Sequence, residues 1–196
     1  TKGKLALAEY KNYQASIDRI AEGGDILNSL PTNAEISPDF IFGMAVESGS
    51  PHVPDAALQY SNELLRSANK MIGLAPVALI SYPDIITEAI EEQNLCVELV
   101  IEERVFKSLS EVTKNTMSKL DKYDEADLYI YDDSLPYALW IMEHTDSTTA
   151  GITVHNNGGV QGIITNDTPE AVAWARDCYR GYRNQATPVK QSTTNT

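Results

Sequence analysis

The first 22 residues carry apolar side chains at the spacing of a helix that packs along one stripe. The positions four and three residues apart in turn are Ala6, Tyr10, Tyr13, Ile17 and Ile20. This repeat is typical of the seam of a coiled or packed helix, and the pair Gly23-Gly24 is a helix-ending signal. We therefore predict a helix over residues 3–22. Because a helix of this length is marginal alone in water, its seam must meet the body or a second copy.

Between residues 25 and 126, runs typical of strands alternate with runs typical of helices. We predict strands at 40–46, 77–81 and 95–101, and helices at 56–71, 83–93 and 105–120. Asp55 can cap the first of these helices, and Pro83 suits the first turn of the second. This alternation predicts a βαβα unit with parallel strands.

From Asp127 the pattern changes to short apolar runs separated by turn residues. The runs that resemble strands are 128–131, 137–142, 151–155 and 160–165, and the turn pair Asn157-Gly158 predicts a hairpin between the last two. Thr168-Pro169 begins a helix that runs to about Asn184, and the polar residues after Thr187 are expected to be disordered. The whole order predicts an α/β fold: a mixed β-sheet with flanking helices, in which the βαβα unit is followed by an antiparallel meander and a C-terminal helix.

The composition adds a strong acidic balance to this fold. The 196 residues include 28 acidic and 15 basic side chains, so the net charge is −13. Such a surface repels phosphate backbones, and this chain alone should not bind DNA. An acidic excess is typical of a halophilic source and equally of an ordinary acidic cytosolic protein. No apolar run approaches the roughly 18 residues of a membrane span and no signal peptide opens the chain, so we expect a cytoplasmic location without membrane contact.

Motifs for catalysis are absent from the sequence. It contains no G-x-S-x-G, no phosphate-binding Walker loop and no G-x-G-x-x-G after a strand. His52, His144 and His155 have no second histidine or cysteine at ligand spacing, so we expect neither a metal site nor a cofactor. A hydrolase that uses Asp132 or Asp133 would need a catalytic partner that the sequence does not show. We therefore expect a protein that is not an enzyme.

Polar side chains that follow the predicted strands mark candidate ligand positions. These side chains are His52, Ser81, Tyr82, Tyr129, Asp132, Asp133 and Tyr137. Carboxylates and tyrosines that gather at strand ends suit the rim of a pocket for a small polar ligand. The alternative is a solvated turn, since aspartate and serine favour turns by bonding their own backbone.

Several segments, taken in order, resemble a family of archaeal, halophile-type winged-helix transcription regulators with a FilR-type sensor domain, first described in a methanogenesis regulator. The segments that carry the resemblance are Thr1–Leu7 (TKGKLAL), Pro51–Pro54 (PHVP), Glu63–Ala68 (ELLRSA), Gly73–Pro76 (GLAP), Asp132–Tyr137 (DDSLPY) and Asp167–Ala175 (DTPEAVAWA). The last strands and helix also resemble the sensor domains of sugar-responsive archaeal regulators, whose fold is similar to phospholipase D. The phospholipase signature H-x-K is absent, since Pro54, Asp146 and Asn157 follow the three histidines two residues on.

The resemblance implies the effector-sensing and dimerisation domain of a transcription regulator. Such a domain binds a small polar ligand and repositions a winged-helix DNA-binding domain that this sequence lacks. It implies a homodimer and an unknown effector, with DNA contacted through the winged helix and not by this chain. We accordingly expect a neck and dimerisation helix at 1–24, an effector-sensing domain at 25–186 and a disordered tail at 187–196. The alternative is a protein–protein interaction module without a small-molecule ligand, in which the ten tyrosines are interface residues.

Overall fold

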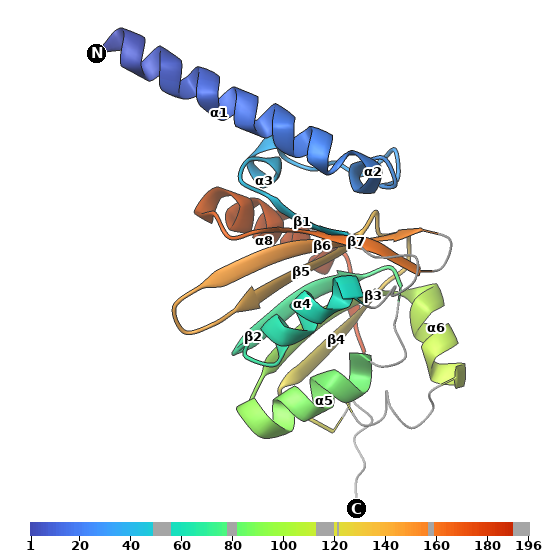
Figure 1. Ribbon diagram of the computed structural model, residues 1–196. Helices are drawn as coiled ribbons and strands as arrows, with labels where there is room; N and C mark the ends of the chain where they lie inside the picture. Colours follow the sequence, from blue (N-terminus) through green and yellow to red (C-terminus); the bar gives the residue numbers. More distant parts are fainter. Residues whose placement is uncertain (49–55, 78–81, 113–119, 121, 157–158, 190–196) are drawn as a thin grey trace, which may run out of the picture.

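A computed structural model describes residues 1–48, 56–77, 82–112, 120, 122–156 and 159–189. In these residues the chain forms an eight-stranded mixed sheet with helices on both faces (Figure 1). The elements in chain order are α1 (Lys2–Glu22), α2 (Gly24–Leu27), α3 (Pro38–Ile41), β1 (Ala45–Ser48), α4 (Ala56–Leu65), β2 (Lys70–Ala75), α5 (Tyr82–Gln93), β3 (Cys96–Glu102), α6 (Glu103–Val112), β4 (Ala126–Tyr131), β5 (Ala138–Glu143), β6 (Thr148–Asn156), β7 (Gly159–Asn166), α8 (Pro169–Arg183) and β8 (Thr187–Pro188). None of the described helices is both long and apolar enough to cross a membrane.

The sheet joins a parallel half to an antiparallel half, in the strand order β1-β7-β6-β5-β2-β3-β4-β8. In the parallel half, Met71 of β2 lies opposite Val97 of β3, and Val97 lies opposite Ala126 of β4. β5 returns antiparallel to β2 and continues through β6, β7 and β1. Asn156 pairs with Gly159 across the predicted hairpin. The predicted mixed sheet, with a βαβα unit followed by a meander and a closing helix, is therefore confirmed.

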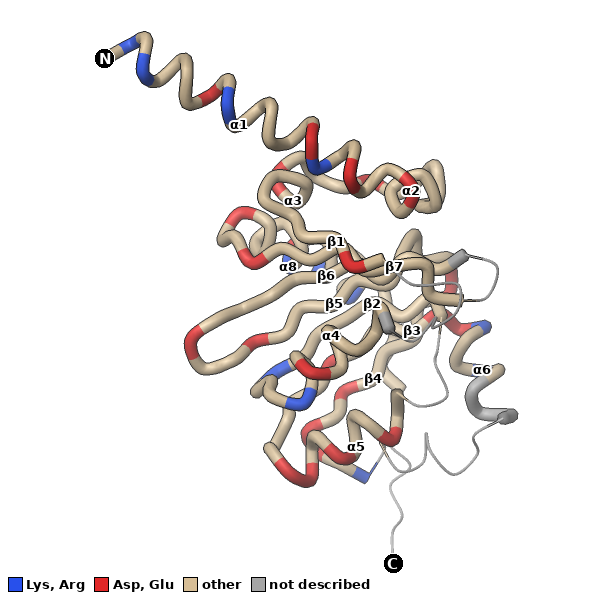
Figure 2. The backbone as a smooth tube through the Cα atoms, viewed as in Figure 1, with Lys and Arg blue, Asp and Glu red and all other residues tan. Residues whose placement is uncertain are grey.

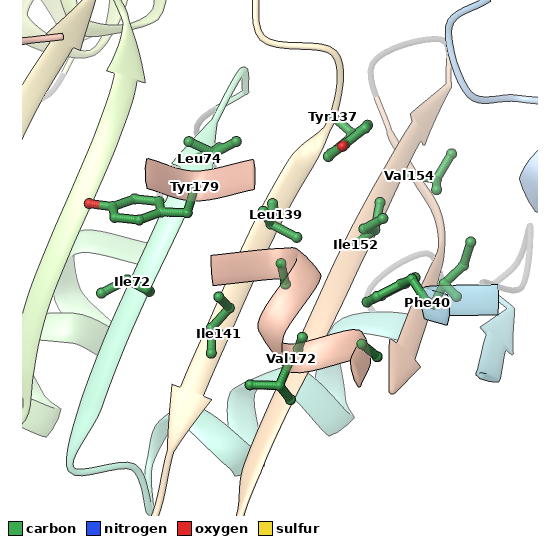
Figure 3. Packing of buried hydrophobic residues seen from close by; sticks show 14 of the residues in the cluster. Phe40, Ile72, Leu74, Tyr137, Leu139, Ile141, Ile152, Val154, Val172 and Tyr179 are labelled. Atoms are coloured by element: carbon green, nitrogen blue, oxygen red, sulfur yellow. The ribbon is translucent and has the colours of Figure 1, made fainter. Parts of the chain in front are cut away.

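The two faces of the sheet carry separate hydrophobic cores, because successive side chains along a strand point to opposite faces. In β5, Leu139 and Ile141 pack with α8 and α3, whereas Trp140 and Met142 pack with α4 and α5. Figure 3 shows the first of these cores, where Val172 and Tyr179 of α8 lie over side chains from β2, β5 and β6. α8 itself begins at a Thr168 cap, whose hydroxyl accepts a hydrogen bond from the Ala171 amide.

The predicted strand at 40–46 is only partly correct. Phe40 and Ile41 belong to the short helix α3, and the strand β1 begins at Ala45. Ser37 explains the helix, because its hydroxyl accepts a hydrogen bond from the Asp39 amide at 3.1 Å, next to a proline in the first turn.

The predicted helix at 56–71 and strand at 77–81 are displaced. α4 ends at Leu65, and residues 70–75 form the central strand β2. β2 is buried on both faces, so its apolar residues run on without the alternation that identifies a half-exposed strand. Residues 78–81 lie outside the described part of the chain.

The predicted helix at 105–120 and the predicted tail also differ from the structure. α6 begins at Glu103 and is described as far as Val112, while residues 113–119 lie outside the description. At the other end, Thr187 and Pro188 pair with β4 as β8, and the Val189 amide donates to the Leu128 carbonyl at 2.8 Å. The first three residues of the predicted tail, 187–189, therefore pair with or hydrogen-bond to β4.

Gly151 tests how tightly the sheet centre is packed. A Cβ atom at Gly151 would lie 2.1 Å from the Trp140 ring, so the ring or the strand would have to move. We expect Gly151→Ala to lower the free energy of unfolding by about 1–3 kcal/mol, the usual cost of overpacking, in urea denaturation. Gly181→Ala is the control, because its Cβ would meet nothing within 4 Å and alanine favours a helix. Equal effects of the two substitutions would contradict this account.

Candidate functional site

A cavity of about 100 Å³ lies between the sheet and α5, on the face opposite α8. Its described lining residues are Met71, Gly73, Leu74, Ala75, Val77, Tyr82, Pro83, Ile86, Leu99, Ile101, Leu120, Leu128, Ala138, Leu139, Trp140, Thr153 and His155. The cavity lies toward the carboxyl end of β2, which ends at Ala75. Here the chain has placed β3 and β4 on one side of β2 and then returns with β5 on the other. Such a topological switch point is where open α/β sheets bind ligands.

The indole of Trp140 forms the sheet side of this cavity. Trp140 pairs with Gly73 in β2 and with Gly151 in β6, so it has a glycine on each neighbouring strand. The missing side chain at Gly151 leaves room for the ring. The indole Nε1 donates a hydrogen bond to Thr153 Oγ1 at 3.1 Å, which sets the direction of the ring. Trp140 is only 4% exposed, so neighbouring side chains hold its ring in one orientation. The part of the ring that lines the cavity is therefore a preformed aromatic surface.

The polar groups of the cavity are uncharged at neutral pH. His155 follows a register shift in β6, and its burial lowers the pKa below the ordinary value of 6.5, although a hydrogen bond to the Thr153 backbone acts in the opposite direction. Tyr82 opens α5 and shares a hydrogen bond with the Ser61 hydroxyl in α4; burial raises the pKa of this phenol. No Asp, Glu, Lys or Arg is among the described lining residues. The described part of the lining can therefore hydrogen-bond a ligand without supplying a charge.

Among the residues that the sequence marked for ligand binding, Tyr82 lines this cavity and the other described ones do not. Asp132 and Asp133 are exposed, and Asp133 Oδ1 accepts a hydrogen bond from the Ser134 amide at 2.7 Å. This geometry is that of a solvated turn. His52 and Ser81 lie outside the described residues.

Tyr137 and Tyr129 lie on the α8 face of the sheet, away from the cavity. The Tyr137 hydroxyl donates to the Glu35 carbonyl at 3.1 Å and lies 3.4 Å from Cys178 Sγ. Its burial raises the pKa of the phenol far above the ordinary value. The Tyr129 ring lies 3.2 Å below the Arg183 guanidinium carbon, in a cation–π contact. Both tyrosines therefore help to attach α8 to the sheet.

A half-buried ion pair completes the attachment of α8. Glu98 Oε1 accepts hydrogen bonds from Arg183 Nε and from the Tyr179 hydroxyl, both at 2.8 Å. The side chains of Arg183 and Glu98 are 29% and 26% exposed, so solvent weakens this pair less than it weakens a surface pair. The C-terminal turn of α8 is thereby joined to β3.

Glu102 is a buried carboxylate at the end of β3, with 1% exposure. Its Oε1 accepts a hydrogen bond from the Leu135 amide at 2.8 Å, and its other oxygen pairs with Arg104. The two partners offset the cost of burying this charge. Because Leu135 belongs to the link that enters β5, Glu102 fixes the approach of β5 to the cavity.

Trp140, Thr153 and His155 line the cavity but were not among the candidate residues from the sequence. Thr153 and His155 share one face of β6 because they are two residues apart. Only the pairing of β6 with β5 brings that face to Trp140, and no local pattern reveals this pairing.

A second hollow, of about 660 Å³, lies between the β5–β6 turn and the start of α8. It is lined by polar residues that include His144, Asp146, Asp167 and Arg176. His144 Nε2 lies 3.0 Å from the Leu64 carbonyl, and its Nδ1 has no partner among the described residues. Asp146 and Asp167 are exposed, so this hollow is a wet surface feature and differs from the apolar cavity.

α1 projects from the body and contacts only α2 and α3 closely among the described elements, so no residue of its predicted seam is buried (Figure 1). Tyr10, Tyr13, Ile17 and Ile20 are 55%, 65%, 46% and 43% exposed, and Ala6 is exposed as well. Figure 2 shows that α1 carries both signs of charge, whereas the body is mainly acidic. Its four basic and three acidic residues give α1 a net charge of +1, so the rest of the chain, with 25 acidic and 11 basic residues, carries −14.

Comparison with protein families finds one match over most of the body. The family model described as "Methanogenesis regulatory protein FilR1, middle domain" matches residues 54–185. No curated protein matches the sequence.

Solved structures with a similar fold include a chromatin protein and a phospholipase D family member. The archaeal chromatin protein TrmBL2, described with a novel mode of DNA binding, superposes with a TM-score of 0.58 at 12% identity, over 96% of this chain and 67% of that one. NucT from Helicobacter pylori has a TM-score of 0.56 at 13% identity, over 74% of this chain and 98% of that one. Nuc from Salmonella typhimurium, a phospholipase D family member, has a TM-score of 0.55 at 15% identity, over 75% and 99% of the two chains. At these identities the likeness concerns the fold alone.

The depressed pKa of His155 makes the stability of the fold depend on pH. Folded His155 resists protonation, so the unfolded chain binds more protons once the pH falls to about 6.5. We expect the free energy of unfolding to be highest above that pH and to decrease as the pH falls through it toward the folded pKa.

Urea unfolding at pH 7.5 and pH 5.5 measures this effect. His155→Gln should show a smaller loss between the two pH values than the unchanged chain, because glutamine does not titrate. His144→Gln is the control for replacing a histidine outside the cavity. An unchanged pH dependence in His155→Gln would show that the cavity does not hold this imidazole neutral.

Proposed function

The chain belongs to the family of the FilR1 middle domain and is thus a transcription-regulator domain, and we propose that it senses a small molecule and forms a homodimer. In this proposal the cavity beneath α5 binds the effector, and α1 pairs with α1 of a second copy. DNA contact belongs to a separate winged-helix domain of the regulator, because an acidic body repels phosphates.

The observation that carries the dimer is the exposed seam of α1. Its residues repeat at the coiled-coil spacing, yet none of the helix is buried against the body. Full burial of an exposed isoleucine contributes about 1.5–3 kcal/mol. Ile17 and Ile20 are 46% and 43% exposed, so pairing with a second copy would gain roughly half of that for each residue, which offsets part of the cost of association. Two acidic bodies repel each other, whereas two nearly neutral helices can meet. A second copy therefore suits this surface.

A connected set of contacts links the cavity to the end of α1. Thr153 and His155 lie in β6, which pairs with β7. The Gln161 side chain of β7 donates to the Asp25 carbonyl of α2 at 3.1 Å, and a Cβ at Gly162 would lie 2.4 Å from Ile26. α2 follows α1 directly. An effector that moves the β6–β7 hairpin would thus change the direction of α1, which is the differential contact that allosteric coupling requires.

Binding without catalysis is the proposed role of the cavity. Its described polar side chains lack a carboxylate that could orient His155 as a base beside a nucleophile. In this proposal, the fold that the chain shares with NucT and Nuc serves as a scaffold for binding.

A substitution that places a charged side chain in the seam of α1 tests whether the dimer forms through this helix. We expect Ile17→Glu to convert a dimer, of twice the 21.6 kDa chain mass, into a monomer, because two buried glutamates would face each other. Multi-angle light scattering over a wide concentration range measures the mass, with circular dichroism as a check of folding.

Ala15→Glu is the matched control, since it adds the same charge to α1 outside the seam and should remain dimeric. A monomeric unchanged chain at all concentrations, or equal masses for the two variants, would refute pairing through α1.

A further inference from the structure

The size of the cavity beneath α5 limits what it can hold. Its volume of about 100 Å³ exceeds the roughly 10–15 Å³ that a single water needs, and is smaller than the apolar cavities of about 150 Å³ that bind benzene. A whole benzene ring therefore exceeds the enclosed volume, but the lining residue Val77 is 42% exposed, so the cavity opens to solvent there and can hold part of one ring or a short branched chain.

The lining favours an apolar body. Ile86 and Pro83 of α5 face Leu99, Leu128 and other aliphatic side chains of the sheet. The preformed indole surface of Trp140 adds an aromatic contact, which favours a ring in an offset or edge arrangement. A ligand rich in hydroxyl groups would leave most of them without partners here, at a cost of about 1–3 kcal/mol for each buried group.

The titratable and hydroxyl side chains of the described lining come from two elements, β6 and α5. Thr153 and His155 lie two residues apart on one face of β6, and Tyr82 opens α5. Hydroxyl and imidazole groups can donate to or accept from a single hydroxyl or carbonyl group on the ligand. A charged group would find no counter-ion among the described lining residues, so these residues would not offset the cost of its desolvation.

We propose that the cavity beneath α5 binds a small uncharged molecule, with an aromatic or branched aliphatic body and a single hydroxyl or carbonyl group that meets His155, Thr153 or Tyr82. This inference rests on the proposed sensing function and names its ligand class. This ligand class differs from the small polar ligand that we expected from the sequence. The polar hollow beside α8 would suit such a polar ligand better.

The fluorescence of Trp140 gives a direct readout. The chain has two tryptophans, and Trp174 packs with Phe40 on the other face of the sheet, so Trp174→Phe leaves Trp140 as the sole reporter. Titration of this variant with p-cresol should change the Trp140 emission to saturation. The charged analogues 4-methylbenzoate and 4-methylbenzylamine, which have the same ring, should bind at least about tenfold more weakly, a difference of about 1.4 kcal/mol.

Two substitutions locate the site. Ala138→Leu places a larger side chain at the cavity and should weaken p-cresol binding at least about tenfold. The matched control Ala45→Leu, on the exposed edge strand β1, should leave the affinity unchanged. His155→Leu tests the polar contact without filling the cavity further: it should reduce the preference for p-cresol over toluene, whatever its effect on stability.

The outcomes separate the ligand class from the sensing function. Tighter binding of the charged analogues or of a polyol such as glucose would overturn the ligand class and leave sensing in place. Binding of p-cresol that Ala138→Leu does not weaken would overturn the assignment to this cavity. If no probe of any class binds, sensing and ligand class both fail, while light scattering decides the α1 dimer independently.

Discussion

The arrangement of Trp140 between two glycines is the constraint on which the candidate site depends. Gly73 and Gly151 pair with Trp140 from the strands on either side, and a Cβ at Gly151 would overlap the indole. The ring can therefore lie on the sheet at the junction of its parallel and antiparallel halves. A one-residue slip of β5 would turn Trp140 to the α8 face and remove the cavity, because alternate residues point to opposite faces.

The two faces of the sheet are held together in different ways. On the α8 face, Glu98, Arg183 and Tyr179 join helix and strand by directed hydrogen bonds. On the α5 face the contacts are mainly apolar and leave a cavity. Proteins with a similar fold include a chromatin protein and a phospholipase D family member, so the scaffold is compatible with several functions. The particular side chains on the α5 face decide what this chain can bind.

Charge and hydrophobicity separate α1 from the body. The chain outside α1 has a net charge of −14, while α1 has a net charge of +1 and exposes Tyr10, Tyr13 and Ile17. In the proposed dimer, electrostatic repulsion disfavours contact between the bodies, and the apolar seam favours contact through α1. The direction of α1 is then the proposed output of the domain, since α2 connects it to β7.

The sequence by itself determined the elements whose signals are local. The period of α1, the antiparallel pairing of β6 with β7 and the Thr168 cap of α8 depend on near neighbours, and so does the order of strands and helices. Only the tertiary structure showed that an apolar run buried on both faces, such as β2, is a strand. It also decided which distant residues share a site. Asp132 and Asp133 were candidates from the sequence yet form a solvated turn. His155 and Trp140 line the same cavity only because β5 pairs with β6. The register between strands is a property of the assembled sheet, and no single segment contains it.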